Sequence, residues 1–263
     1  MATIRQGLQL LQSPDFARLF AAYVITFTGN AMSPIAIAFG VLALTGSTRD
    51  SSVVIAAPTL AAILVMLFAG VFADRAGRKR QMILAESLAA VSMSAIAVLF
   101  LTHHATVPVL AGLMMLAGTA AAMNSTASTG IIPLVVEATE LQSANALLGA
   151  ARSGSTTLGA ALAGVLVATL GAGITIAVDA ATFVVSAMLI ASIKAKPQAP
   201  MEAASIFADL RLGWREFISH QWLWTIVLQF SVLVAAGDAV FGLLGPAVAK
   251  TQMNGAVDWG LIS

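Results

Sequence analysis

Long runs of apolar residues, separated by short polar segments, form the main pattern of this 263-residue chain. A helix needs about 20 apolar residues to cross the roughly 30 Å hydrocarbon core of a bilayer. Because the runs are continuous rather than alternating, they predict helices and not the strands of a membrane barrel. We expect seven membrane-spanning helices, at residues 19–44, 53–73, 82–101, 107–132, 146–170, 174–193 and 222–248.

The composition also indicates an all-α integral membrane protein. Hydrophobic residues make up 59% of the chain and charged residues only 10%, whereas about one quarter of a soluble domain is charged. The absence of cysteine excludes disulfides and thiolate metal sites. We expect no metal and no cofactor. The basic residues border apolar spans and form no soluble patch, so no nucleic-acid partner is expected.

The distribution of lysine and arginine predicts a cytoplasmic amino terminus. With that orientation only Arg49 and Lys250 lie outside, which is a strong positive-inside bias. The inside residues are Arg5, Arg18, Arg75, Arg78, Lys79, Arg80, Arg152, Lys194, Lys196, Arg211 and Arg215. Residues 1–12 show no cleavage pattern of a signal peptide, so the first span is expected to insert the chain. His103 and His104 fall in an outer loop, where a pH-sensing or metal-binding role is the alternative to plain solvation.

The composition of the chain changes after the sixth span. Residues 194–221 contain two prolines and then apolar residues at helical spacing, with charged residues on the opposite side. This pattern predicts an amphipathic helix at the cytoplasmic membrane surface, with a partner-binding helix as the alternative. The domains expected are therefore a six-helix bundle at 1–193, a linker with a surface helix at 194–221, and the start of a second bundle at 222–263, apparently truncated.

A dense cluster of charge and glycine, residues 70–80, joins the second and third spans. Asp74 lies at the carboxyl end of a helix, where the helix dipole disfavours a bare carboxylate by about 0.3–1 kcal/mol. The neighbouring arginines and lysine offer that carboxylate cationic partners, and Gly77 allows the chain to reverse within a few residues. Fixing the topology of the chain is one role of these charges.

The same segment resembles the signature loop of the major facilitator superfamily. It has the form Gly70-x-x-x-Asp74-Arg75-x-Gly77-Arg78-Lys79, at the place in the topology where that superfamily carries it. The resemblance implies a six-helix bundle of two three-helix repeats, and transport by alternating access between two such bundles. It also implies that the loop acts as a conformational gate, in which Asp74 and Arg78 help to hold the inner ends of the two halves together. The residues so assigned are Gly70, Asp74, Arg75, Gly77, Arg78 and Lys79.

Two further segments refine the resemblance. Residues 145–148 and 179–186 are similar to a bacterial exporter branch that includes the enterobactin exporter. The fifth span contains Gly149, Gly154, Gly159 and Gly164. It partly resembles the glycine-rich antiporter motif of drug exporters, with Gly159, Ala160 and Gly164 at three of its positions, although Ala160 stands where that motif has proline and Ala163 where it has another glycine. Close helix packing through small residues is the alternative interpretation of these glycines.

Ionisable groups within the spans are candidates for transport chemistry, since an unpaired charge in hydrocarbon costs several kcal/mol. Glu86, Asp179 and Asp238 are each candidates to take up a proton or bind a cationic substrate. A gate role is the alternative for Glu86, and a structural hydrogen-bonding role for Asp179. Asn30, which lies before Pro34 in the first span, is a candidate for substrate contact or for helix packing. The fourth span lacks the arginine that many proton-coupled relatives carry in its first turns.

These features predict a secondary transporter of the major facilitator type in the bacterial inner membrane. We expect it to be a proton-driven exporter of a small amphipathic molecule such as a drug, a metabolite or a siderophore. The partners expected are that substrate, the lipid bilayer and a missing carboxyl-terminal half. A seven-helix receptor or assembly protein without transport, or an inactive fragment, are the alternatives. No catalytic motif is found, so an enzyme is not expected.

Overall fold

The computed structural model describes residues 9–194 and 206–238, without the side chains of residues 67, 71, 73, 74, 206–210 and 234–238. The chain divides into two compact units, Met1–Glu202 and Ala203–Ser263. The first unit holds α2 (Pro14–Thr45), α3 (Thr48–Ala76), α4 (Arg78–Leu101), α5 (Val107–Val135), the short η1 (Ala138–Glu140) and α6 (Leu141–Ser192). The second holds α7 (Ile206–Ser219) and α8 (Gln221–Asp238).

Five helices of the described residues are long and apolar enough to cross a membrane: Pro14–Thr45, Thr48–Met66, Arg78–Leu101, Val107–Val135 and Ala138–Ser192. They correspond to the first six predicted spans, because the last of the five includes both the fifth span and nearly all of the sixth. The seventh predicted span overlaps α8 at residues 222–238, and its remainder lies outside the described residues. The observed architecture is thus that of an all-helical, multi-pass membrane protein.

The long helix α6 is a hairpin that crosses the bundle twice. At Gly171 the backbone leaves the helical region, with φ 83° and ψ 168°, a conformation that favours glycine. Ala144 and Ile190, near its two ends, belong to one buried cluster, whereas Ile176, close to the break, belongs to another. The two ends of α6 therefore lie at one end of the bundle, which we call the Gly77 end, and its middle lies at the opposite, His103 end.

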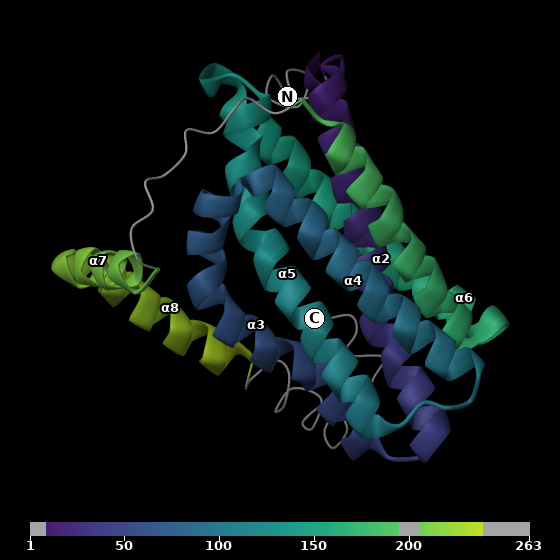
Figure 1. Cartoon of the computed structure of the whole chain (residues 1–263). Helices are drawn as coiled ribbons and strands as arrows, with labels where there is room; N and C mark the ends of the chain where they lie inside the picture. Colours follow the sequence, from purple (N-terminus) through teal and green to yellow (C-terminus); the bar gives the residue numbers. More distant parts are fainter. Residues whose placement is uncertain (1–8, 195–205, 239–263) are drawn as a thin grey trace, which may run out of the picture. The chain divides into compact units, whose positions relative to one another are not determined.

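Packing in the first unit places α2 along α6 and α3 along α5, with α4 against both α5 and α6 (Figure 1). Glycine residues with a positive φ angle end α2 and α3. Gly46 closes α2 with φ 67° and donates its N–H to the Leu42 carbonyl, and a single residue, Gly77 with φ 85°, separates α3 from α4. Both conformations are readily adopted by glycine, so the reversals need no longer loop.

Within α7 the rings of Trp214 and Phe217 stack with their centroids 5.9 Å apart. Leu212, Trp214 and Ile218 are exposed within this unit. Apolar side chains that face outward on a short helix are typical of a helix at a membrane surface. An amphipathic helix at the cytoplasmic membrane surface stays the prediction for this segment.

Candidate functional site

A hollow of about 430 Å³ opens on the surface of the first unit, between α2, α5 and the first half of α6. This volume lies within the range of small-molecule binding pockets. Its lining combines amides, hydroxyls and a few apolar side chains: Tyr23, Phe27, Asn30, Ala121, Asn124, Ser125, Ser128, Thr129, Ile132, Asn145, Leu148, Gly149 and Arg152. So many polar groups on membrane-spanning helices indicate a wall that faces water or a ligand rather than lipid.

Arg152 is the charged residue of this lining. The distribution of lysine and arginine predicts that it lies on the cytoplasmic side, and it falls inside the predicted span 146–170. In the structure it lies on α6 with its guanidinium 5.2 Å from the centroid of the Phe27 ring, a cation–π contact between α6 and α2. In the sequence, the feature that distinguishes Arg152 is that it is a single cation within a predicted span.

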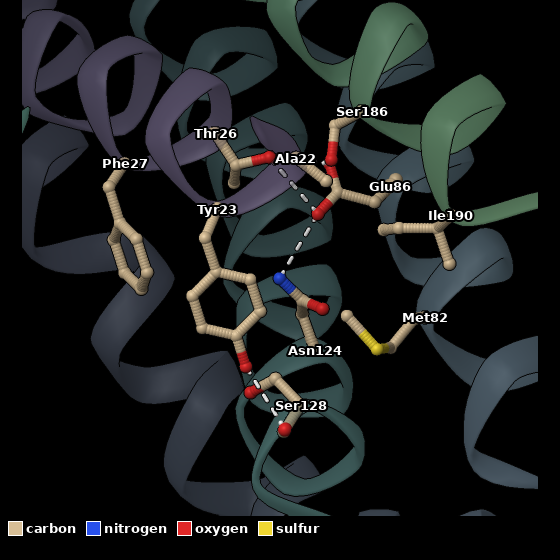
Figure 2. A pocket seen from close by; sticks show the side chains of 10 residues that line it. All are labelled: Ala22, Tyr23, Thr26, Phe27, Met82, Glu86, Asn124, Ser128, Ser186 and Ile190. Atoms are coloured by element: carbon tan, nitrogen blue, oxygen red, sulfur yellow. Dashed lines mark hydrogen bonds between the residues drawn. The ribbon is translucent and has the colours of Figure 1, made fainter. Parts of the chain in front are cut away.

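Behind the hollow lies a second, smaller pocket around Glu86 (Figure 2). Glu86 projects from α4, is only 2% exposed, and accepts hydrogen bonds from Thr26 Oγ1, at 3.2 Å to Oε2, and from Asn124 Nδ2, at 3.1 Å to Oε1. The Ser186 side chain from α6 points toward the same carboxyl group. The volume of about 20 Å³ is enough for a single water molecule.

Four residues line both the small pocket and the hollow and so separate them: Tyr23, Phe27, Asn124 and Ser128. The Tyr23 hydroxyl donates a hydrogen bond to the Ser128 carbonyl oxygen at 3.0 Å. Asn124 binds Glu86 with its nitrogen, while its oxygen is buried without a hydrogen-bond partner among the described residues. Glu86 thus lies directly behind the lining of the hollow.

Of the other candidates named from the sequence, Asn30 lines the hollow and also a third pocket that Glu86 borders. Asp179 is fully buried and faces α2, where it accepts a hydrogen bond from the Ser33 hydroxyl. Thr182 donates to the Asp179 carbonyl oxygen at 2.7 Å, and a Cβ at Gly29 would collide with both side chains. Asp179 therefore joins α2 to the second half of α6. Asp238 ends α8, and its side chain lies outside the described residues.

The signature loop lies at the Gly77 end. Lys79 donates from Nζ to the carbonyl oxygens of Ala191 and Ile193, at 2.7 and 2.6 Å, so it caps the carboxyl end of α6. The Arg78 side chain occupies the space in which Gly130 of α5 would carry a Cβ. Gly70 faces open space in the described structure, and Arg75 is exposed. The Asp74 side chain, the centre of the proposed gate, lies outside the described residues.

Gln81, which the sequence analysis did not single out, follows this loop and is completely buried. Its Nε2 lies 3.1 Å from the Ala69 carbonyl oxygen, 2.8 Å from that of Met123 and 2.9 Å from Thr126 Oγ1. These contacts join α3, α4 and α5 beneath the loop. As with Asn124, the signal available in the sequence was an amide side chain within or beside an apolar span.

The four glycines of the fifth span differ in their surroundings. A Cβ at Gly159 would collide with the Thr28 carbonyl oxygen, so α2 and α6 approach closely there. Gly149, Gly154 and Gly164 face open space in the described part of the chain. Close helix packing within the first unit thus accounts for one of these four glycines, Gly159. Among the described residues, no group of three or more His, Cys, Asp or Glu side chains could hold a metal ion.

A bundle of membrane-crossing helices with a polar hollow on one wall and a buried carboxyl group behind it is an arrangement that suits membrane transport. Comparison with protein families gives the same result, since residues 6–262 match the family described as transmembrane secretion effector. The chain belongs to this family, which is part of the major facilitator superfamily and consists of transporters rather than enzymes.

Among characterised proteins, the chain is similar to the multidrug efflux pump Tap of Mycolicibacterium fortuitum. The two are 28% identical over 233 residues, which cover 86% of this chain and 57% of the pump. The chain therefore spans somewhat more than half the length of this relative.

Proposed function

We propose that this chain forms the amino-terminal bundle and the beginning of the second bundle of a proton-driven exporter. The complete transporter would contain a second bundle, supplied by more of the same polypeptide or by another chain, and would enclose the substrate between the two. In transporters of this kind the substrate site lies near the membrane midplane, at the interface of the repeats. The observation that carries the proposal is the polar hollow on α2, α5 and α6.

The chemistry of the hollow suits a small amphipathic substrate. Phe27 and Leu148 offer apolar surface, while Asn30, Asn145 and Arg152 offer hydrogen-bonding groups. The family membership and the similarity to an efflux pump support export as the direction of transport. A drug, a metabolite or a siderophore all have this chemistry, and the similarity of residues 145–148 and 179–186 to an exporter branch supports the same class.

The expected setting is a bacterial inner membrane with the amino terminus in the cytoplasm. The positive-inside distribution supports this orientation, and it places the Gly77 end, with Arg78, Lys79 and Arg80, on the cytoplasmic side. A gate at that end would open and close the hollow toward the cytoplasm. We propose that Asp74, Arg75, Arg78 and Lys79, with Gly70 and Gly77, form this gate between the two bundles.

The experiment is transport by the complete protein, reconstituted into lipid vesicles, under an imposed pH gradient. Phenylnaphthylamine, a neutral apolar dye, serves as the probe. We expect the pH gradient to drive accumulation of the dye against its own gradient, and a protonophore to abolish it. Vesicles without protein are the control. Accumulation that persists in the presence of the protonophore would contradict proton-driven transport. The absence of any protein-dependent dye movement in a folded sample would contradict transport of such molecules.

A further inference from the structure

We propose that the hollow is a site for organic anions, with Arg152 as the group that binds the anionic end of the ligand. This inference rests on the proposed transport function and specifies the substrate class: a molecule with an aromatic or apolar body and one carboxylate or sulfonate group. The juxtaposition that carries it is a guanidinium exposed in the hollow, above an aromatic ring and beside uncharged hydrogen-bonding groups.

The charge balance of the hollow selects the sign of the ligand. Arg152 contributes a permanent positive charge, because a guanidinium stays protonated in proteins, and no carboxylate belongs to the described lining. The nearby carboxyl group, Glu86, lies behind Asn124, and its oxygens are occupied by Thr26 and Asn124. A cationic ligand in this half of the site would be repelled by Arg152, the charged group of the lining, and an anionic ligand would be attracted by it.

The Phe27 ring holds the guanidinium in place. A cation over an aromatic face is worth about 0.5–1 kcal/mol at an exposed site and more when it is desolvated. Such support lowers the conformational entropy that Arg152 would lose on binding a ligand. The planar guanidinium can then donate two parallel hydrogen bonds to a carboxylate or sulfonate, which is the strong, bidentate form of this contact.

The remaining lining explains how the rest of the ligand would be held. Ile132 and Leu148 provide an apolar surface, and Asn145, which shares α6 with Arg152, places an amide on the same wall. An arginine within a membrane span is costly unless it faces a cavity or a partner. A hollow that accepts an anion supplies such a setting.

The experiment measures binding of two dyes to the complete transporter in lipid nanodiscs. Anilinonaphthalene sulfonate and phenylnaphthylamine share one aromatic skeleton and differ by the sulfonate group. Dye fluorescence is titrated, empty nanodiscs are subtracted, and unlabelled naphthalene sulfonate defines the saturable part. For the wild type we expect saturable binding of the anionic dye. Arg152→Gln is expected to weaken it by about tenfold, with less than about a twofold change for the neutral dye.

Two further variants control for charge and for shape. Arg152→Lys keeps the charge without the planar, bidentate geometry, so we expect an affinity between those of the wild type and Arg152→Gln. Arg49→Gln removes one exposed positive charge at the His103 end of the first unit, and we expect it to leave both dyes unaffected.

The proposal is overturned if the anionic dye does not bind saturably to the wild type, or if Arg152→Gln weakens both dyes equally, since a merely structural arginine would do the latter. Transport is measured on the same samples. If the dyes are transported but Arg152 gives no preference for the anionic dye, the anion site is contradicted and the exporter function stands. If binding depends on Arg152 but neither dye is transported, the exporter function is contradicted and the anion site stands.

Discussion

Asn124 on α5 donates a hydrogen bond from Nδ2 to Glu86 Oε1 on α4, at 3.1 Å, and the same Asn124 side chain lines the open hollow. The buried Glu86 carboxyl group therefore lies directly behind the lining of the hollow, to which Asn124 belongs. Protonation of Glu86 would change the hydrogen bonding of Asn124, because a neutral carboxylic acid can also donate. This arrangement offers a direct route by which proton uptake can be sensed at the hollow.

The first prediction tests the hypothesis that Glu86 carries the proton of a proton-driven exporter. Glu86→Gln keeps the size and much of the hydrogen bonding of the side chain but cannot take up and release a proton. In the reconstituted complete transporter, we expect proton-driven accumulation of phenylnaphthylamine to fall by about tenfold or more, the equivalent of about 1.4 kcal/mol. Exchange of the dye between equal concentrations, which needs no net proton movement, should persist.

Glu137→Gln is the matched control, since Glu137 is an exposed carboxylate of the same bundle. We expect it to accumulate the dye as the wild type does. Normal uphill accumulation by Glu86→Gln would show that the proton is carried elsewhere. A loss of both accumulation and exchange would instead assign Glu86 a structural role in joining α2, α4 and α5.

The second prediction concerns the buried amide beneath the signature loop. Gln81→Leu removes the donor that contacts Ala69, Met123 and Thr126. Side-chain hydrogen bonds between membrane helices are worth about 0.6 kcal/mol on average and up to about 2 kcal/mol, so we expect a loss of about 1 kcal/mol and a lower unfolding temperature. Thermal unfolding of the purified protein in detergent measures it. Gln221→Leu, at an exposed glutamine of the second unit, is the control, and an equal effect of both variants would contradict the role of Gln81.

The apolar pattern predicted the helices well because the thickness of the bilayer sets their length. The spans expected at 82–101 and 107–132 lie within α4 and α5, and the interval left between 170 and 174 contains the break at Gly171. The signature loop likewise indicated a tight turn, and Gly77 provides it. These features depend on local sequence alone.

The site was harder to predict because it depends on which side of each helix faces the hollow. Apolar residues surround these helices on all sides, so hydrophobic periodicity marks no inner face. The sequence therefore gave no reason to bring Arg152 of α6 over Phe27 of α2, or to place Asn124 beside Glu86. Lone polar residues within or beside spans were the available signal, and two of the most informative, Gln81 and Asn124, are uncharged.

The third prediction concerns the gate. If Asp74 helps to hold the two bundles together, Asp74→Asn removes its charge without changing its size. We expect normal expression and a loss of transport of about tenfold, the effect of removing an interaction of about 1.4 kcal/mol. Accumulation of phenylnaphthylamine by the complete transporter measures it. Asp50→Asn changes a carboxylate in the first turn of the same helix and should leave transport unchanged, whereas wild-type transport by Asp74→Asn would remove the gate assignment.

The last prediction compares two glycines of α5 that differ only in what lies opposite them. A Cβ at Gly118 would collide with the backbone of Pro58 on α3, including its carbonyl oxygen, whereas a Cβ at Gly112 would meet open space. Since backbone cannot move aside as a side chain can, Gly118→Ala should force α3 and α5 apart and cost about 1–3 kcal/mol. Gly112→Ala should stabilise the helix by up to about 1 kcal/mol, the difference in helix propensity. Thermal unfolding of both variants in detergent tests this pair, and a Gly118→Ala variant as stable as Gly112→Ala would show that the two helices do not approach each other so closely.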